Sequence, residues 1–380
     1  MAFDTAPTSA SPGAETSSRI VLFGATGYTG RLTARALVDR GSRPVLAGRH
    51  VDRLASLAAE LGGGLETVVA DVRDPASVRA LVGAGDVLIS TVGPFARYGR
   101  PAVAVAVDAG AHYLDSTGEA AFIREVFTEF GPRATRSALL TAFGCDYVPG
   151  NLAGALALAE APAAVRVDIG YFVRGAADAG GISSGTRASA AGMMIARHHA
   201  WRNGRIVLEP AARHVRTFPV GSRAKLAASI GGTEQFALPR IAPQLTEVEV
   251  YLGWFGPATR PLQVLSVGMS ALTKVPGATR LIEAAVRPLT RGTGSGPDAG
   301  TRARRGTSVV AVCSDADGNP LSQVLVQGVD GYDFTATMLA WGAEQLAAGA
   351  VSGTGALGPV DAFGLAALER GCAEAGIVRS

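Results

Sequence analysis

Three glycines spaced three residues apart, Gly24, Gly27 and Gly30, are the residues of this sequence with the clearest chemical use. They directly follow a short apolar run and precede a stretch with apolar residues at helical spacing. Glycines at a strand-to-helix turn let backbone amides approach a ligand, and a helix N-terminus favours negative charge. A tight turn that binds nothing is the structural alternative. The sequence predicts a pyrophosphate-binding turn formed by Gly24, Ala25, Thr26, Gly27, Tyr28, Thr29 and Gly30.

The residues after the second predicted strand indicate which dinucleotide is bound. An NAD site places Asp or Glu there to accept a hydrogen bond from the ribose 2′-hydroxyl. This sequence has Leu-Ala-Gly-Arg-His at 46–50, with a guanidinium where the carboxylate would stand. A guanidinium suits the dianionic 2′-phosphate of NADP(H), so Arg49 and His50 are predicted to bind that group. A solvated arginine at the start of a helix is the alternative.

Two further strand ends are predicted to contact the cofactor. Asp71 ends the third predicted strand, where dinucleotide folds often touch the adenine, although it could equally cap the next turn. Thr91, Gly93 and Pro94 end the fourth predicted strand, across the crevice where the strand order should reverse. Gly93 and Pro94 stop this strand, so the backbone can line the nicotinamide ribose; a plain turn is the alternative.

Hydride transfer usually needs a proton donor within hydrogen-bond reach of the substrate. Four candidates are predicted beyond the carboxyl ends of the later strands: Tyr98, Cys145, Asp146 and Tyr147. Tyr98 could donate to a developing enolate or amine, or could simply pack against neighbouring prolines. Asp146 could instead cap a helix, and Cys145 has no base nearby in the sequence to make it a nucleophile. Asp115 could orient a substrate group or cap the helix that follows.

Strand and helix patterns alternate with short turns from Arg19 to about Leu156. Six strands with five crossovers and no hairpin signal predict an α/β fold with a doubly wound parallel Rossmann sheet. Asp74 followed by Pro75 is a typical helix start. The predicted strands are Ile20–Phe23, Pro44–Ala47, Glu66–Ala70, Val87–Thr91, His112–Leu114 and Leu139–Ala142. The predicted helices are Gly30–Arg40, Asp52–Leu61, Asp74–Val82, Arg100–Ala109 and Glu119–Thr135.

After about Gly154 the pattern changes to that of a mixed or antiparallel sheet, which we interpret as an inserted α+β domain. A helix is predicted from about Ser184 to Trp201, with His198 and His199 on it. Helical spacing returns from Tyr332 and again from about Asp361, which predicts C-terminal helices packed on the first domain. The predicted strands of the inserted domain are Val165–Val173, Arg205–Leu208, His214–Phe218, Gln235–Ala237, Glu247–Phe255, Thr307–Ser314 and Gln323–Gln327.

These patterns divide the chain into four predicted segments. They are a disordered tail at 1–18, an NADP-binding Rossmann domain at 19–153, a substrate or dimerisation domain at 154–331 and the C-terminal helices at 332–380. The tail is rich in Ser, Thr, Ala and Pro and has neither the basic start nor the apolar run of a signal peptide. No uninterrupted apolar stretch reaches the roughly eighteen residues that would predict a transmembrane helix.

Composition and charge exclude several classes of function. At 380 residues, 48% of them hydrophobic, the chain can bury sizeable cores in two domains. A formal net charge of +3 and the lack of a basic stripe with interleaved aromatics argue against nucleic-acid binding. The three cysteines, Cys145, Cys313 and Cys372, have no metal-ligand spacing, which predicts no metal site and fits a reducing cytoplasm.

The ordered set of motifs resembles a known family. The segments GATGYTG, LAGR, STVGPFARYGRPAVAVAVDAGAHYLDSTGE and GCDYVPGNLAG together look like the saccharopine dehydrogenase-like oxidoreductases. SSGTRASA and GYDFTATMLA are similar to segments of the branch that contains the mycobacterial trans-acting enoyl reductases. The resemblance implies a Rossmann domain, an inserted mixed α/β domain and NADPH chemistry. In that branch the substrate is an acyl chain carried on a polyketide synthase.

The residues and the resemblance together favour an NADPH-dependent reductase of a C=C or C=O bond in an acyl or polyketide-like intermediate. A C=N reductase of the saccharopine type is a second hypothesis, and a regulator that binds NADPH without turnover is a third. The expected partner is a small-molecule or carrier-bound acyl substrate, and the chain could form a homodimer. The basic amphipathic stretch from Leu262 to Leu289 could touch a membrane surface or an acyl carrier protein, although a core helix is the more ordinary interpretation.

Overall fold

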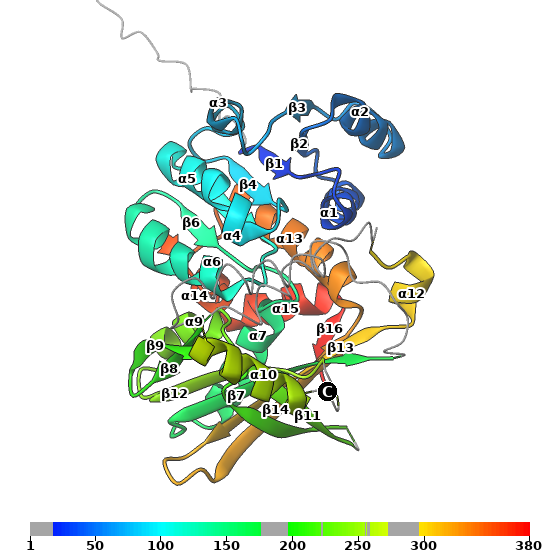
Figure 1. The fold of residues 1–380 in the computed structure, drawn as a ribbon. Helices are drawn as coiled ribbons and strands as arrows, with labels where there is room; N and C mark the ends of the chain where they lie inside the picture. The colour runs from blue at the N-terminus through cyan, green and yellow to red at the C-terminus, as the bar shows by residue number, and fades with distance from the viewer. Residues whose placement is uncertain (1–17, 176–196, 222, 255, 257–258, 273–295) are drawn as a thin grey trace, which may run out of the picture.

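The computed structural model describes residues 18–175, 197–221, 223–254, 256, 259–272 and 296–380 (Figure 1). Its first sheet is entirely parallel and doubly wound, because the strand order runs outward in both directions from β1 and β4. In sheet order the strands are β15 (Gly355–Ala356), β6 (Ala138–Leu140), β5 (His112–Asp115), β4 (Val87–Ser90), β1 (Ile20–Phe23), β2 (Val45–Gly48) and β3 (Thr67–Val69).

Helices cover the first sheet and explain its apolar strands. β2 and β4 are buried along their whole length, as expected of parallel strands with helices on both faces. The predicted cap of α3 is confirmed, because the Asp74 carboxylate accepts a hydrogen bond from the backbone N–H of Ala76 at 3.1 Å. The helices of this layer are α1 (Tyr28–Asp39), α2 (Val51–Glu60), α3 (Pro75–Arg79), α4 (Phe95–Tyr98), α5 (Arg100–Ala109) and α6 (Ala120–Glu125), the last continued by a π turn (Val126–Phe130) and a 3-10 turn (Gly131–Arg133).

The second sheet is mixed, and β12 and β7 are its parallel pair. Arg216 on β10 forms an ion pair with Asp168 on β7, although β11 and β12 lie between those strands in sheet order, so the sheet is strongly curled. The curl encloses a small apolar cluster around Phe172, Phe218 and Tyr251. The strands in order are β10 (Val215–Val220), β11 (Arg223–Ile230), β12 (Glu247–Leu252), β7 (Arg166–Arg174), β13 (Gly306–Ser314), β14 (Pro320–Gly328) and β16 (Ile377–Arg379), with the hairpin of β8 (Arg197–Arg202) and β9 (Arg205–Pro210) beside β12.

A layer of helices lies between the two sheets (Figure 1). α7 (Val148–Glu160) packs against β7, β13 and β14 and is buried on nearly every side, which suits its uniformly apolar sequence. α13 (Gly331–Ala347) packs against α1, β4 and β5, so the predicted return of the C-terminal part to the first layer is confirmed. The remaining helices are α9 (Glu234–Ile241), α10 (Thr259–Leu272), α12 (Ala299–Ala303), α14 (Pro359–Phe363) and α15 (Leu365–Glu374).

Several predicted elements of the second half were wrong. Residues 235–237 lie in the helix α9, not in a strand, and the predicted strand 247–255 ends at Leu252. Residues 197–201 of the predicted helix 184–201 form the strand β8, which carries His198 and His199, and residues 184–196 lie outside the described part of the chain. These segments are short apolar runs whose state is decided by their neighbours, because β8 pairs with β9 and β12 while α9 packs on α7.

The domain boundaries stay predictions, and the one between residues 153 and 154 falls within α7. Residues 1–17 of the predicted tail lie outside the described residues. The basic stretch 262–289 is described only as far as the end of α10, at residue 272. Across the described part of the chain, we find no helix with the length and apolar character needed to cross a membrane.

Candidate functional site

A cavity of about 580 Å³ opens at the carboxyl ends of β1 and β4, the two strands from which the sheet order runs in opposite directions. Doubly wound sheets bind their ligands at this position. Five of the predicted site residues do not line the cavity: Ala25, Gly30, Pro94, Cys145 and Tyr147. Twelve do line it, namely Gly24, Thr26, Gly27, Tyr28, Thr29, Arg49, His50, Asp71, Thr91, Gly93, Tyr98 and Asp146.

The glycine-rich turn is packed too tightly for side chains at two of its positions. Gly24 has a φ of +90°, and a Cβ there would lie 2.7 Å from the Thr91 hydroxyl oxygen. A Cβ on Gly30 would lie 2.2 Å from the Gly24 carbonyl oxygen, so only glycine lets α1 start this close to β1. Among the described residues, none accepts a hydrogen bond from the backbone N–H groups of Tyr28, Thr29 and Gly30. These donors at a helix N-terminus suit the phosphates of a dinucleotide.

The Tyr28 side chain ties this turn to residues far along the chain. Its hydroxyl donates to the carbonyl oxygen of Pro297 at 2.5 Å and accepts from the Arg302 guanidinium at 3.0 Å. Its ring packs edge-on against Tyr332, with ring centroids 4.9 Å apart, and Arg302 also pairs with Asp333 at 2.7 Å. The turn is therefore braced by the segment that leads into β13 and by the start of α13.

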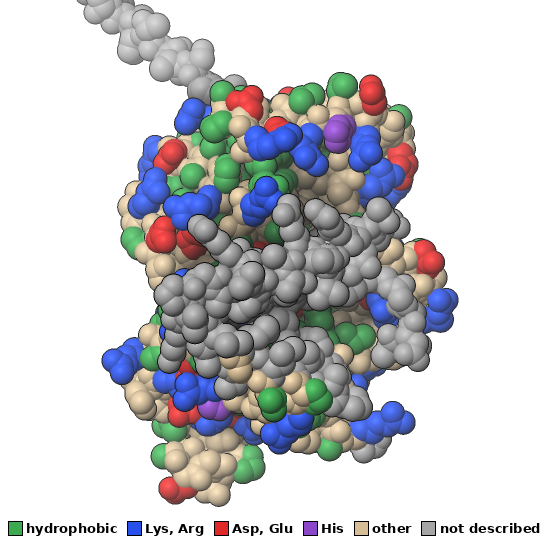
Figure 2. Space-filling view, viewed as in Figure 1, with side chains coloured by type: hydrophobic (Ala, Val, Ile, Leu, Met, Phe, Trp, Pro, Cys, Tyr) green, Lys and Arg blue, Asp and Glu red, His purple; other side chains and the backbone are tan. Residues whose placement is uncertain are grey.

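Cationic side chains surround the end of the cavity beside β2. Arg49 and His50 follow β2 directly, and Arg53 stands one helical turn further along, in α2. Arg49 and Arg53 are exposed, and neither forms an ion pair with a described residue, so both charges are available to an anion. Figure 2 shows many arginine side chains, drawn in blue, over this upper part of the molecule. The surroundings suit a phosphate group rather than an uncharged ribose hydroxyl.

Asp71 lines the same end of the cavity but is bonded to a neighbouring arginine. The Arg73 guanidinium donates to the Asp71 carboxylate at 2.7 Å, and the backbone N–H of Arg73 donates at 2.9 Å. These hydrogen bonds lower the pKa of Asp71 to about 2. Asp71 is therefore ionised at neutral pH and holds Arg73 at the cavity wall, and its contact with the adenine stays a prediction.

The residues after β4 form the opposite wall. The Thr91 hydroxyl lies 3.2 Å from the carbonyl oxygens of both Phe23 and Gly24, so it joins the ends of β1 and β4. Gly93 lines the cavity, whereas Pro94 is the residue that precedes α4. The predicted contact of this turn with the nicotinamide ribose is consistent with the position of Thr91 and Gly93.

The Asp146 carboxyl lines the same cavity, as do Tyr98 and Trp254. It lies beside Gly118, where a Cβ would be 3.1 Å from Oδ2. Burial raises the pKa of Asp146 to about 6, so the carboxyl can hold a proton near neutral pH. Asp146 does not cap α7, because Tyr147 occupies the N-cap position. The arrangement suits an acid that faces a ligand.

Three other polar candidates lie outside the cavity lining. The Cys145 sulfur is 3.7 Å from the Thr307 hydroxyl, and burial raises the pKa of its thiol far above the usual range, which does not suit a nucleophile. The Tyr147 hydroxyl donates to the Gly118 carbonyl oxygen at 3.3 Å. Asp115 is fully buried, accepts hydrogen bonds from residues 141 and 142, and neither faces the cavity nor caps a helix.

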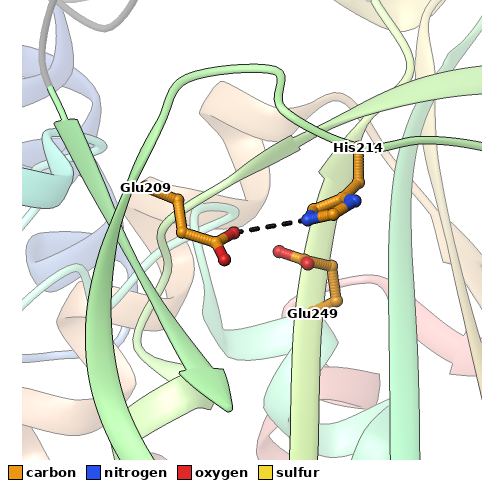
Figure 3. A group of neighbouring side chains, drawn as sticks. All are labelled: Glu209, His214 and Glu249. Atoms are coloured by element: carbon orange, nitrogen blue, oxygen red, sulfur yellow. Dashed lines mark ion pairs between the residues drawn. The ribbon is translucent and has the colours of Figure 1, made fainter.

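A group of possible metal ligands lies in the second sheet, far from the motifs of the sequence (Figure 3). Glu209, His214 and Glu249 place their ligand atoms within 4.8 Å of one another. Arg202 pairs with both glutamates, at 3.4 Å from Glu209 and closer to Glu249, and His214 lies 3.4 Å from Glu209. A guanidinium between the two carboxylates already supplies the positive charge, so we interpret this group as an ion-pair cluster.

One family matches the chain over most of the first sheet. It is the saccharopine dehydrogenase NADP binding domain, matched by residues 20–139. Residues 20–139 therefore resemble a saccharopine dehydrogenase NADP-binding domain. The matched range contains every residue predicted to bind the cofactor, from Gly24 to Pro94. NADP(H) is thus the cofactor of this domain, as the sequence predicted.

Curated relatives match the same part of the chain. The trans-acting enoyl reductase of Mycobacterium leprae is 40% identical over 140 residues, which are 35% of this chain and 34% of that protein. The trans-acting enoyl reductase of Mycobacterium tuberculosis is 38% identical over 146 residues, 37% of this chain and 35% of that protein. The chain therefore matches about a third of the length of these relatives.

The fold of the whole chain is similar to that of a solved enzyme. Apo saccharopine dehydrogenase (L-Glu forming) from Saccharomyces cerevisiae superposes with a TM-score of 0.58, covering 96% of this chain and 99% of that chain at 12% sequence identity. The likeness confirms the predicted fold class, a Rossmann sheet with an inserted mixed domain.

Sequence reasoning missed Arg53 and Trp254 among the residues that line the cavity, and it did not predict the supporting role of Glu119. Arg53 could have been found from its position in the first turn of α2, which follows Arg49 and His50 directly. Trp254 lines the cavity from the end of β12, and nothing in the sequence connects it with the glycine-rich turn. Glu119 accepts hydrogen bonds from the backbone N–H groups of Phe95 and Ala96 at 2.7 and 2.9 Å, and so fixes the start of α4.

Proposed function

We propose that this chain is an NADP-dependent oxidoreductase that reduces the C=C bond of an enoyl group held on an acyl carrier. The NADP-binding family supports the cofactor. The relatives named trans-acting enoyl reductase support the reaction class and the carrier-bound substrate. The observation that carries the proposal is the cavity that extends from the glycine-rich turn and Arg49 to the Asp146 carboxyl.

The residues at one end of the cavity fit NADP(H). We assign the pyrophosphate to the backbone N–H groups of Tyr28 and Thr29, whose close approach depends on the missing side chain of Gly30. We assign the 2′-phosphate to Arg49 and Arg53, which are exposed and unpaired among the described residues. The nicotinamide then lies toward the residues that follow β4.

The residues at the other end suit the substrate. Bound NADPH supplies a hydride to the β-carbon of the enoyl group, and a proton must reach the α-carbon to complete the reduction. Asp146, held partly protonated at neutral pH, is our candidate for the proton donor, and Tyr98 is a second candidate among the residues that line the cavity. After donation, the Asp146 carboxylate regains a proton from water. Trp254 offers an apolar face for an acyl chain.

In this proposal, residues 154–331 form the substrate domain. Trp254 supports the assignment, since it belongs to the second sheet region and yet lines the cavity of the first sheet. An acyl carrier would present its substrate from the side where Trp254 lies. Crevices between a dinucleotide domain and a second domain are common positions for such sites.

The proposal is tested by NADPH oxidation with a panel of thioesters and imines. Enoyl and β-ketoacyl pantetheine thioesters and a cyclic imine are offered to the protein, and NADPH absorbance is followed. We expect turnover of the enoyl thioester, reduced at least tenfold in Asp146→Asn, with NADPH binding unchanged. Turnover of the imine alone would establish a C=N reductase instead. Tight NADPH binding without any turnover would leave a regulator.

A further inference from the structure

A carboxyl group that the sequence did not single out lies beneath the Asp146–Tyr147 turn. Glu234, the first residue of α9, has no exposed surface. Its Oε1 lies 2.6 Å from the Tyr171 hydroxyl oxygen, and its Oε2 has no hydrogen-bond partner among the described residues. A buried carboxylate whose described partners are all neutral groups is costly, so this environment favours the neutral acid.

The hydrogen bonds around the Tyr171 hydroxyl also indicate that Glu234 is protonated. The oxygen lies 2.9 Å from the Gly150 N–H, which can only donate, and 3.1 Å from the Tyr147 carbonyl oxygen, which can only accept. The phenol has one proton, and all three contacts are satisfied if that proton goes to Tyr147. The short contact with Glu234 is then a hydrogen bond donated by a protonated carboxyl.

Two glycines make room for this group. A Cβ on Gly150 would lie 2.1 Å from the Tyr171 hydroxyl and 2.2 Å from Glu234 Oε1. A Cβ on Gly232 would lie 2.4 Å from Glu234 Oε2. The backbone therefore lies close to the carboxyl on both sides, and none of the described Lys or Arg side chains forms an ion pair with it. Burial accordingly raises the pKa of Glu234 to about 8.

The titratable groups around Glu234 are mostly neutral at physiological pH. Burial raises the pKa of both Tyr147 and Tyr171 far above the usual range. His199 on β8 bonds to the Gly232 carbonyl oxygen at 2.7 Å, and burial lowers its pKa to about 4. Asp146 is the nearby group that titrates in this range, and its negative charge further disfavours ionisation of Glu234.

We propose that Glu234 is a positioning residue that, as a neutral acid, donates its proton to Tyr171 and thereby holds the Asp146–Tyr147 turn at the wall of the cavity. The proposal rests on the proposed function, in which Asp146 faces the substrate. Ionisation of Glu234 removes the donated hydrogen bond and places a second negative charge beneath Asp146. Turnover therefore falls at alkaline pH, although Glu234 never touches the substrate or the cofactor.

The test compares the wild-type chain with Glu234→Gln, whose amide can donate to Tyr171 but cannot ionise. In infrared spectra of the protein without cofactor, we expect the C=O band of a buried neutral carboxyl at pH 7. The part of this band that disappears as the pH rises through about 8 should be missing in Glu234→Gln. Absence of the band from the wild-type protein at pH 7 would overturn the proposal, whatever reaction the protein catalyses.

The second measurement is the pH profile of kcat with the best substrate of the panel. In both proteins kcat should fall as Asp146 loses its proton above about pH 6, and above about pH 8 the wild type should fall more steeply than Glu234→Gln. An equal alkaline fall in both proteins would contradict a role for Glu234. If Glu234→Gln does not fold, Tyr171→Phe replaces it. Removing the hydroxyl takes away the acceptor of the carboxyl proton, so the neutral-carboxyl band should disappear at a lower pH than in the wild type, and an unchanged band would count against the assigned hydrogen bond.

Discussion

Replacement of Arg49 by alanine tests how the cavity selects NADPH over NADH. Arg49 follows β2, is exposed and pairs with no described carboxylate, so its loss removes no contact of the fold. A charge-assisted hydrogen bond contributes about 1.5–3 kcal/mol. That free energy corresponds to roughly tenfold to a hundredfold in affinity. Because water and salt screen an exposed group, and because Arg53 lines the same end of the cavity, we expect the lower end of this range.

The affinities of NADPH and NADH are measured by fluorescence titration in low and in physiological salt. NADPH should bind about tenfold more weakly to Arg49→Ala, while NADH should change by less than about twofold. Arg79→Ala is the matched control, because Arg79 is also an exposed arginine of the first layer but does not line the cavity. Equal weakening of both cofactors, or a similar loss in the control, would refute the assignment of Arg49 to the 2′-phosphate.

Two further variants test the glycine-rich turn and the Asp146 carboxyl. Gly30→Ala places a Cβ 2.2 Å from the Gly24 carbonyl oxygen. It should therefore destabilise the fold by about 1–3 kcal/mol and weaken NADPH binding. Thermal melts measure the loss of stability, and Gly268→Ala is the control, because a Cβ there meets open space. Asp146→Asn should stabilise the protein at pH 8 by roughly 1–3 kcal/mol and change it little at pH 4. The reason is that folding raises the pKa of Asp146 to about 6, so its contribution to stability is present at low pH and is lost as the pH rises through that value. A variant equally stabilised at both pH values would contradict the raised pKa.

Short-range patterns predicted the first sheet well. The six strands from Ile20 to Leu140 and their crossover helices lie within a few residues of the predicted positions, because parallel strands are continuous apolar runs and the helices between them show helical spacing, with a recognisable cap at α3. The missed strand β15 has two residues and pairs with β6 from more than two hundred residues away. A pair of residues carries no periodic signal.

The second half was predicted less well for a physical reason. Strands such as β8 and β11 are edge or hairpin strands whose partners decide their state, and the apolar residues of α9 are too few to show a helical period. The long strands β7 and β13 were found, because their apolar residues extend over nine positions each.

By itself the sequence determined the local parts of the cofactor site: the turn that only glycine can form, the arginine in place of a carboxylate after the second strand, and the fold class that brings these two strand ends to one edge. Those features depend on neighbours in the chain, so type and spacing suffice to predict them. Tertiary structure alone decided which polar groups face the cavity. In the folded protein, Cys145 and Asp115 do not line the cavity, whereas Trp254 does. The Tyr28 hydroxyl donates a hydrogen bond to the Pro297 carbonyl oxygen, and Glu234 is buried below Asp146. Such contacts join residues from separate elements, and their protonation depends on burial, which no spacing in the sequence encodes.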